Sequence, residues 1–349
     1  MTRSFADDDD LDDAEETAET GDLRRKRAQL RRENARKSVK PIVTLGTEDG
    51  VVTRVDARNC RVRVGGQDLD CRVRGSLYLG KGELSQPVAV GDRVKVKIGS
   101  TPPGVIVSVL PRTNVFERPH ADKVHRQIIA SNIDQIVMVQ AWRTPELNLR
   151  LLDRMLVGAL RGGIAAVVVI NKIDLADDQA LLEEVRGIYA KAGFTVIETS
   201  VVTGQGIDLL RAQLQGKTSL VAGPSGVGKS ALLTTVQPGL ALRSGEVSDW
   251  SGKGMHTTTS ATLLAIEGGG FVVDTPGVRE FGLQDIRPEE IGLFYPDFEP
   301  HRTHCAIRGC THDHEDGCRV RAAFEAGLVH ASRFDSYLRL LDSVKRGEG

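Results

Sequence analysis

The sequence predicts an α/β protein in which a mostly parallel sheet is preceded by a small β-barrel and followed by a metal-bound helical domain. Three observations support this prediction. Short strands with basic residues fill residues 45–112, apolar runs alternate with helical stretches from Asp134 onwards, and cysteines gather with histidines near the C-terminus. A chain of 349 residues exceeds one hydrophobic core, so we expect several domains.

The composition is that of an ordinary globular protein, with 40% apolar and 27% charged residues. No run of eighteen apolar residues occurs and the N-terminus is acidic, so we expect neither a membrane span nor a secretory signal. Aromatic residues make up only 4% of the chain, which argues against wide stacking platforms. The five cysteines favour metal binding over a disulfide framework.

Residues 1–44 form a charged tail in which an acidic block precedes a basic block. Because the tail contains few apolar residues, we interpret it as disordered and solvated. The alternative is that Arg24 to Lys40 form a phosphate-binding arm, which the acidic block shields when no RNA is present. In both cases the tail lies outside the folded core.

Residues 45–112 alternate apolar and polar side chains in short runs, with Gly65-Gly66 as a turn, which is typical of a small barrel. An oligonucleotide-binding barrel and a generic barrel with a solvated face fit this pattern equally well. The case for nucleic acid rests on basic residues, many of them on the polar face: Arg54, Arg58, Arg61, Arg63, Arg72, Arg74, Arg93, Lys95 and Lys97.

From Asp134 the pattern of strand, helix, strand predicts a mostly parallel sheet covered on both faces. The predicted strands are Ile136 to Val139, Ala165 to Ile170, Thr195 to Ile197, Ser219 to Ala222 and Gly270 to Val273. The predicted helices are Leu149 to Arg161, Gln179 to Ala192, Ile207 to Gln213 and, near the C-terminus, Ser332 to Lys345. We expect the α/β domain to span 113–283 and the last domain to span 284–349.

A phosphate-binding loop follows the fourth of these strands. It matches the full motif, Gly223-Pro224-Ser225-Gly226-Val227-Gly228-Lys229-Ser230, and Ala231 continues into the expected helix. Its glycines let backbone N–H groups turn towards phosphates at the positive end of that helix. Lys229 would reach the β- and γ-phosphates, and the Ser230 hydroxyl would ligate Mg²⁺.

A second loop selects the base. Asn171, Lys172 and Asp174 follow a buried strand, where a ligand meets the carboxyl end of a sheet. The Asp174 carboxylate can accept from the ring N–H and the exocyclic amine of guanine, and adenine lacks that amine. Ser200 stands where a backbone contact to the guanine would come. The sequence therefore predicts that the bound nucleotide is GTP or GDP.

Two further segments complete the predicted site. Asp274 follows an apolar strand and would hold Mg²⁺ through water, and the Gly277 N–H would sense the γ-phosphate. A glycine-flanked segment with three threonines precedes Asp274 in the chain. We assign Thr258 to the Mg²⁺ shell, and Thr257 and Thr259 are the alternatives. The base-selecting loop precedes the phosphate loop, which reverses the usual order, but rotating the chain order leaves the neighbouring strands of a sheet unchanged.

Near the C-terminus, three thiols and an imidazole have the spacing of a closed, tetrahedral structural zinc site. We predict that the ligands are Cys305, Cys310, His312 and Cys318. Four protein ligands leave no open position for catalysis. Other histidines nearby leave the identity of the histidine ligand open: His301, His304 and His314.

The combination resembles the circularly permuted bacterial GTPases that act on the small ribosomal subunit, the ribosome small subunit-dependent GTPase A family. The resemblance covers roughly residues 45–345 and rests on the barrel, on the order of the two loops, on His256 and the threonines after it, on Asp274 to Gly277, and on the metal spacing. It implies a circularly permuted P-loop GTPase domain between an N-terminal OB-fold barrel and a C-terminal zinc-binding α-helical domain.

The resemblance also implies slow GTP hydrolysis that the 30S subunit stimulates during late maturation of that subunit, coupled to release from it. The implied partners are the 30S subunit, its 16S rRNA, GTP and GDP; the implied cofactors are one Zn²⁺, and Mg²⁺ with GTP. We expect a cytoplasmic monomer without membrane contact. An RNA-binding checkpoint, in which the nucleotide only sets affinity, is the alternative function. A GTPase for the large subunit fits the barrel and metal spacing less well.

Many GTPases have a glutamine directly after the glycine that corresponds to Gly277, and this glutamine orients the attacking water. Here the position is Val278, which cannot orient water, so another group must do so. We hypothesise that His256 takes this role once the ribosome orders its loop. The alternative is that His256 only helps that loop to dock.

Overall fold

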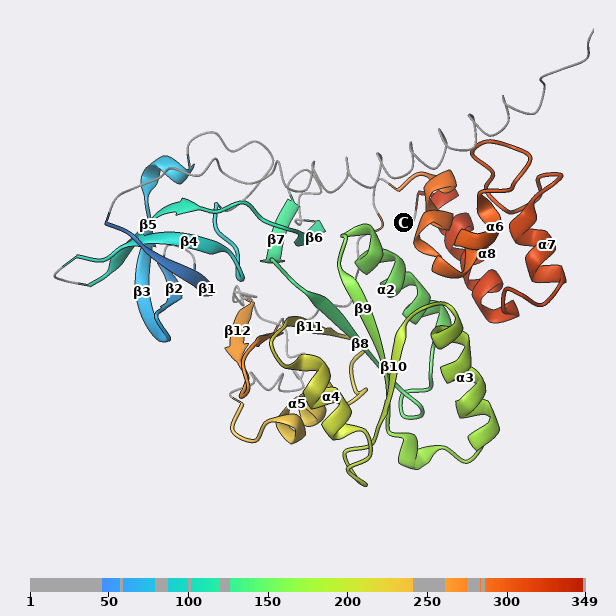
Figure 1. Ribbon diagram of the computed structural model, residues 1–349, viewed down its shortest axis with the longest axis horizontal. Helices are drawn as coiled ribbons and strands as arrows, with labels where there is room; N and C mark the ends of the chain where they lie inside the picture. The colour runs from blue at the N-terminus through green and yellow to red at the C-terminus, as the bar shows by residue number, and fades with distance from the viewer. Residues whose placement is uncertain are drawn as a thin grey trace, which may run out of the picture.

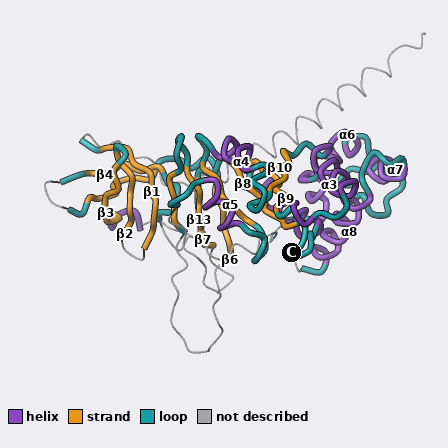
Figure 2. The backbone as a smooth tube through the Cα atoms, turned by 90° about the horizontal axis from the view of Figure 1, so that it is seen from below, coloured by secondary structure: helices purple, strands orange, loops and turns teal. Residues whose placement is uncertain are grey.

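The computed structural model describes residues 46–56, 59–78, 87–99, 102–119, 126–240, 261–274, 283 and 286–347. It shows a five-stranded barrel at one end, a helical domain at the other end and an α/β sheet between them (Figure 1). The same order along the molecule is seen after a quarter turn (Figure 2). The predicted fold class is confirmed.

The barrel consists of β1 (Glu48–Asp56), β2 (Asn59–Val64), β3 (Gln67–Val73), β4 (Arg93–Lys97) and β5 (Gly104–Val109). These strands are ordered β1-β2-β3-β5-β4, and a β1–β4 pairing closes the barrel. Alternate residues fill its interior, among them Val62, Val94, Val96 and Ile106, so the alternation seen in the sequence reflects an inward and an outward face. A short 3-10 helix, η1 (Gly75–Tyr78), follows β3.

The α/β sheet has the order β10-β9-β8-β11-β13-β12. Five strands are parallel to one another: β8 (Gln135–Ala141), β9 (Ala165–Asn171), β10 (Thr195–Thr199), β11 (Thr218–Ala222) and β13 (Phe271–Asp274). Strand β12 (Thr262–Ala265) runs antiparallel to β13 and was not predicted from the sequence. The strand before the phosphate loop lies centrally, as expected of a sheet whose chain order is rotated.

Both faces of this sheet are covered by helices. On one face lie α2 (Leu149–Arg161) and α3 (Gln179–Lys191), and on the other lie α4 (Ile207–Leu214) and α5 (Lys229–Val236). Successive residues of β8 enter different cores, with Ile136 and Met138 facing α2 and Val137 and Val139 facing α4 and α5. A strand buried on both faces needs an unbroken apolar run, which is why these strands do not alternate in the sequence.

The barrel is joined to the α/β sheet by a hydrogen-bonded strand pair and by buried charges. Strand β1 pairs with β12, which makes one continuous eleven-stranded sheet. A hairpin of β6 (Val115–Pro119) and β7 (Arg126–Ser131) lies between the two domains in the chain. The buried Arg112 guanidinium donates to both oxygens of Asp92, and the Ser131 hydroxyl donates to the same carboxylate at 2.6 Å. This network fixes the barrel to the start of the sheet.

The C-terminal domain is built from short helices and one longer helix. Its elements are η3 (Pro288–Phe294), η4 (Pro296–Phe298), α6 (Glu299–Arg302), α7 (Arg319–Glu325) and α8 (Ala331–Lys345). The core of the domain contains Ile291, Tyr295, Phe298, Phe334 and Tyr337, and Val157 of α2 packs into it. The domain therefore shares a core with the face of the sheet that α2 covers.

Arg333 of α8 is the charged centre of this contact and is only 2% exposed. Its guanidinium forms ion pairs with Asp153 of α2 and with Asp297 of η4 at 2.7 Å, and it lies over the Tyr295 ring at 4.5 Å. The Tyr189 hydroxyl of α3 donates to Asp153 at 3.0 Å. Burial raises the pKa of the Asp153 carboxyl, and the Arg333 guanidinium acts in the opposite direction. The ion pair therefore offsets part of the cost of burying this carboxyl group in the interface.

Removal of one partner of this network should destabilise the protein strongly. In Arg333→Met, Asp153 and Asp297 lose their common counter-ion, so the free energy of unfolding should fall by about 3–5 kcal/mol. Urea denaturation followed by tyrosine fluorescence measures the change. Arg339→Met, an exposed site on the same helix, is the matched control and should cost less than about 1 kcal/mol. Equal stability of the two variants would contradict the role of Arg333.

Candidate active site and metal centre

The phosphate loop connects β11 to α5, and all three of its glycines have positive φ, two of them at positions with no room for a side chain. At Gly223, with φ of 150°, an added Cβ would lie 2.1 Å from the carbonyl oxygen of Val139. At Gly228, with φ of 92°, an added Cβ would lie 2.5 Å from the Asn171 amide nitrogen. Side chains are therefore excluded at both positions, and the loop packs directly against β8 and against the base-selecting loop.

Lys229 opens α5 directly after the loop. Its ammonium group donates to the carbonyl oxygens of Gly223 at 2.9 Å and Pro224 at 2.7 Å, so the charge lies against the loop itself. Ser230 and Ala231 are exposed in the first turn of α5, where backbone N–H groups are not used within the helix. The arrangement offers a positive charge, a hydroxyl and the positive end of a helix to a single anion.

The base-selecting loop begins at the end of β9. Asn171 is 2% exposed, and its amide donates to the Val227 carbonyl oxygen at 2.8 Å. The same side chain accepts from the Thr199 hydroxyl at 3.0 Å. Lys172 adopts a left-handed conformation, and its ammonium donates to the Gly226 carbonyl oxygen at 2.8 Å. Two side chains of this loop thus hold the backbone of the phosphate loop, although more than fifty residues separate the two loops in the chain.

Asp174 and Ser200 lie together beside these contacts. The buried Ser200 hydroxyl donates to the Asp174 carboxylate at 2.5 Å and accepts from the Thr203 N–H at 3.1 Å. Asp174 itself is exposed, so it can still accept hydrogen bonds from a ligand. The loop after β10 thereby orients the carboxylate that the sequence assigned to base selection.

Asp274 is the last residue of β13, the strand next to β11, so it ends at the same edge of the sheet as the phosphate loop. The remaining predicted residues of the site lie outside the described part of the chain: His256, Thr257, Thr258, Thr259 and Gly277. The sequence did not point to Thr199 or to the Thr144 carbonyl oxygen, which accepts from Lys172. A single threonine hydroxyl or backbone carbonyl has no recognisable sequence pattern, so neither contact could be predicted from the sequence.

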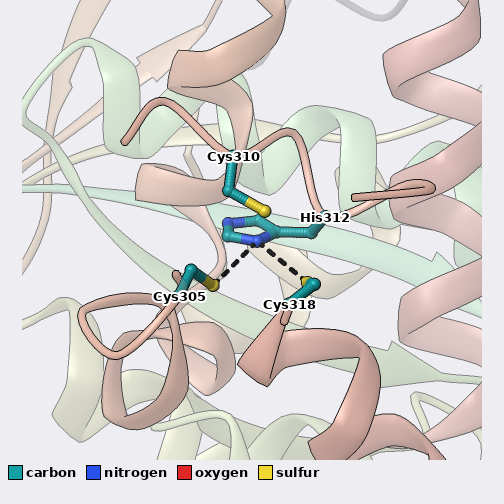
Figure 3. A group of neighbouring side chains, drawn as sticks. All are labelled: Cys305, Cys310, His312 and Cys318. Atoms are coloured by element: carbon teal, nitrogen blue, oxygen red, sulfur yellow. Dashed lines mark hydrogen bonds between the residues drawn. The ribbon is translucent and has the colours of Figure 1, made fainter. Parts of the chain in front are cut away.

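The metal centre brings together the four predicted ligands, Cys305, Cys310, His312 and Cys318, in the C-terminal domain (Figure 3). Their donor atoms all lie within 4.8 Å of one another. The His312 Nδ1 atom lies 3.6 Å from the Cys305 Sγ and 3.5 Å from the Cys318 Sγ. For a tetrahedral ion with bonds of about 2.3 Å to sulfur and 2.0 Å to nitrogen, this separation would be about 3.5 Å. The donors therefore fit one tetrahedral metal ion.

The chemistry of the donors agrees with this fit. Burial lowers the pKa of the His312 imidazole to about 4, so the ring is neutral near pH 7 and has a lone pair for a metal. Burial raises the pKa of the Cys310 and Cys318 thiols, and a bound cation would offset this effect by favouring the thiolates. Cys305 accepts from the Arg319 N–H and Cys318 from the Arg321 N–H, at 3.4 and 3.3 Å.

The loop that carries His312 is held by a neighbouring carboxylate and by α8. Glu315 accepts from the Thr311 N–H and hydroxyl, both at 2.6 Å, and from the Asp313 N–H at 3.0 Å. The Tyr337 hydroxyl of α8 donates to the Thr311 carbonyl oxygen at 2.6 Å. These bonds fix the left-handed conformation of His312 and connect the metal centre to the helix that carries Arg333.

The contact between the two loops gives a first prediction for nucleotide binding. In Asn171→Ala the Val227 carbonyl and the buried Thr199 hydroxyl lose their partner, at a cost of about 1–3 kcal/mol. Affinity for a fluorescent guanine nucleotide should fall by about tenfold. Asn59→Ala, an exposed asparagine of the barrel, is the matched control and should bind normally. An Asn171→Ala protein with unchanged affinity would show that the loops do not depend on this bridge.

The metal centre gives a second prediction. A strong chelator should remove about one divalent ion per chain and lower the thermal stability of the C-terminal domain, because binding of a structural ion contributes to folding. Metal analysis and tyrosine fluorescence measure the two effects. His312→Ala should lose the ion, whereas His314→Ala should retain it because His314 lies outside the cluster. Loss of the ion from both variants, or from neither, would contradict the assignment.

Comparisons with known proteins agree with this geometry. The sequence profile described as RsgA GTPase matches residues 109–284. The small ribosomal subunit biogenesis GTPase RsgA of Chlorobaculum parvum is 41% identical and aligns over 85% of this chain and 98% of its own length. The protein of the same name from Moorella thermoacetica is 42% identical, over 78% and 89% of the two chains.

Two crystal structures show the same fold. YjeQ from Thermotoga maritima has a TM-score of 0.73 and 34% identity, covering 85% of this chain and 98% of that one. YloQ, described as a circularly permuted GTPase, has a TM-score of 0.70 and 27% identity, covering 89% and 99%. The profile spans half of the chain, the relatives align along nearly their whole length, and the two nucleotide loops meet in rotated order. The chain belongs to the RsgA GTPase family, whose members are GTP hydrolases.

Proposed function

We propose that this GTPase binds the 30S ribosomal subunit and hydrolyses GTP to GDP and phosphate late in the maturation of that subunit, and that hydrolysis drives its release. The contact of Asn171 and Lys172 with the phosphate loop carries the proposal, because one nucleotide can then touch both loops. The names of the relatives, small ribosomal subunit biogenesis GTPases, support the choice of partner. Membership of the family supports a role in ribosome biogenesis.

Different residues of the site bind different parts of the nucleotide. Asp174 accepts from the guanine N–H groups, and Ser200 orients it. The N–H groups of Gly223, Ser225, Gly226, Val227 and Gly228 surround the phosphates, and Lys229 neutralises their charge. Pro224 has no N–H and contributes only to the shape of the loop. The oxygens of Ser230, Thr258 and Asp274 hold Mg²⁺ directly or through water, and the Gly277 N–H contacts the γ-phosphate. Bound Mg²⁺ supplies charge stabilisation at the phosphates.

We assign zinc to the metal centre, because three thiolates and one imidazole are typical of closed structural zinc sites. Its role is to hold the short helices of residues 284–349 together. The barrel of residues 45–112 binds 16S rRNA, and the GTPase domain spans 113–283. Among the described helices, none has the length and apolar character needed to cross a bilayer. We propose that the protein acts as a cytoplasmic monomer.

Hydrolysis can be coupled to release because the nucleotide site is connected through the chain to both flanking domains. Strand β12 begins three residues after Thr259 and pairs with β1 of the barrel, so a change in the threonine segment acts on the barrel. Strand β13 ends at Asp274, and the chain after Gly277 leads into the C-terminal domain. Loss of the γ-phosphate can therefore act on both flanking domains.

The test is GTP turnover of the full chain with purified ribosomal subunits. The 30S subunit should stimulate turnover by at least tenfold, and the 50S subunit should not. His256→Ala should retain GTP affinity but lose the stimulation, because the proposed role of His256 is to orient water. Stimulation by 50S subunits alone would overturn the choice of partner. Full stimulation of His256→Ala would remove His256 from the mechanism.

A further inference from the structure

The segment after β8 is a third loop at the nucleotide site, and no motif of the sequence marks it. In the sheet, β8 lies between β9, which leads into the base-selecting loop, and β11, which leads into the phosphate loop. These strands are parallel, so the loops that follow them lie at the same edge of the sheet. Residues 142–148, which we call the middle loop, can therefore contact both of the other loops.

The middle loop is anchored at both ends. The buried Trp142 donates its backbone N–H to the Asn171 carbonyl oxygen at 2.8 Å. At the other end, the Asn148 side chain caps the first turn of α2. Between these anchors, Arg143 forms an ion pair with Asp177 at 2.7 Å, just beyond the base-selecting loop. The exposed part of the middle loop is therefore held in a defined position.

Two residues with left-handed backbones meet at this position. In the described part of the chain only four residues other than glycine have positive φ, and two of them are Thr144, at 53°, and Lys172, at 60°. The Lys172 ammonium donates to the Thr144 carbonyl oxygen. A β-branched residue rarely adopts this conformation, which persists only where neighbouring contacts impose it. The strain at Thr144 is therefore imposed by its surroundings, and the bond from Lys172 is part of them.

One ammonium group joins all three loops. Besides its bond to Thr144, the Lys172 ammonium donates to the carbonyl oxygen of Gly226 in the phosphate loop at 2.8 Å. An ammonium group carries three N–H donors, so both bonds can form at the same time. The backbone of Lys172 belongs to the base-selecting loop, and its charge holds a carbonyl oxygen of each of the other two.

The ring of Pro145 makes a second contact between the middle loop and the phosphate loop. A Cβ added at Gly226 would lie 3.5 Å from the Cδ atom of Pro145, which is an ordinary van der Waals distance. The gap between the ring and the backbone of Gly226 is therefore no wider than one methyl group. Pro145 thus limits how far this part of the phosphate loop can move towards the middle loop.

We propose that Thr144 and Pro145 are positioning residues for the bound guanine nucleotide. The Thr144 carbonyl oxygen holds the Lys172 ammonium, and Pro145 limits the position of Gly226. Together they set the distance between the loop that selects the base and the loop that surrounds the phosphates. A nucleotide of fixed length binds well only at the matching distance. The inference rests on the proposed contact of one nucleotide with both loops, and it assigns neither residue to the chemical step.

The experiment uses the full chain without ribosomes and measures its affinity for a fluorescent GDP and its basal kinetics of GTP hydrolysis. In Thr144→Pro the φ angle is fixed near about −65°, so the carbonyl oxygen can no longer face Lys172. Affinity should fall about tenfold and KM should rise by the same factor, while kcat stays within about twofold. Thr144→Gly adopts the left-handed backbone without strain and should retain the affinity of the wild type.

Two comparisons separate positioning from a general loss of folding. Thr144→Pro combined with Lys172→Met should bind GDP no more weakly than Lys172→Met alone, because Thr144 acts through this ammonium. Pro145→Gly should weaken GDP binding about threefold, because the middle loop loses a rigid contact. Glu146→Gly, at the next exposed position of the same loop, is the matched control and should bind normally.

Several outcomes would overturn the proposal. These are wild-type affinity in Thr144→Pro, additive losses in the double variant, and a fall in kcat that accompanies a lower melting temperature. If Thr144→Pro does not fold, equal affinities of Pro145→Gly and Glu146→Gly decide against the proposal. Failure of 30S stimulation would leave these measurements unchanged, so the proposed function is tested separately.

Discussion

The side-chain bridge from the base-selecting loop to the phosphate loop is the interaction on which the nucleotide site depends. Asn171 and Lys172 donate to two successive carbonyl oxygens, those of Val227 and Gly226, and Gly228 leaves just enough room for the Asn171 amide. The position of one loop is therefore set by the other. The two loops follow β9 and β11, which are separated in the sheet only by β8. Because the contact depends on these places in the sheet, the order of the loops in the sequence does not affect it.

The two flanking domains are attached to this sheet by buried arginine–aspartate pairs of similar design. The Arg112–Asp92 pair lies within the barrel and is joined to the rest of the chain by the Ser131 hydroxyl, whereas Arg333 with Asp153 joins the C-terminal domain to α2. A buried pair of this kind adds little net stability compared with apolar groups, but it tolerates few alternative arrangements, since any displacement leaves a charge without a partner. The construction suits a protein whose flanking domains must respond together.

Much of the fold and of the site followed from the sequence, because the signals were local. The helix Leu149–Arg161 begins and ends where its apolar period predicts, and the four metal ligands form the expected cluster. Features that depend on distant contacts were not predicted. The antiparallel strand Thr262–Ala265 is short, and Arg333 in α8 resembles any surface arginine of an amphipathic helix. The basic residues of the barrel were predicted as one set, although Arg61, Arg63 and Lys95 are paired with aspartates that only the strand register brings opposite them.

The most direct measurement is a crystal structure of the full chain with a non-hydrolysable GTP analogue and Mg²⁺. The account predicts one nucleotide whose guanine N–H groups lie within about 3 Å of the Asp174 carboxylate and whose β- and γ-phosphate oxygens lie within about 3 Å of the Lys229 ammonium. It would be contradicted by a nucleotide whose phosphates contact Lys229 while its base lies away from Asp174, with the bridge between the two loops still formed.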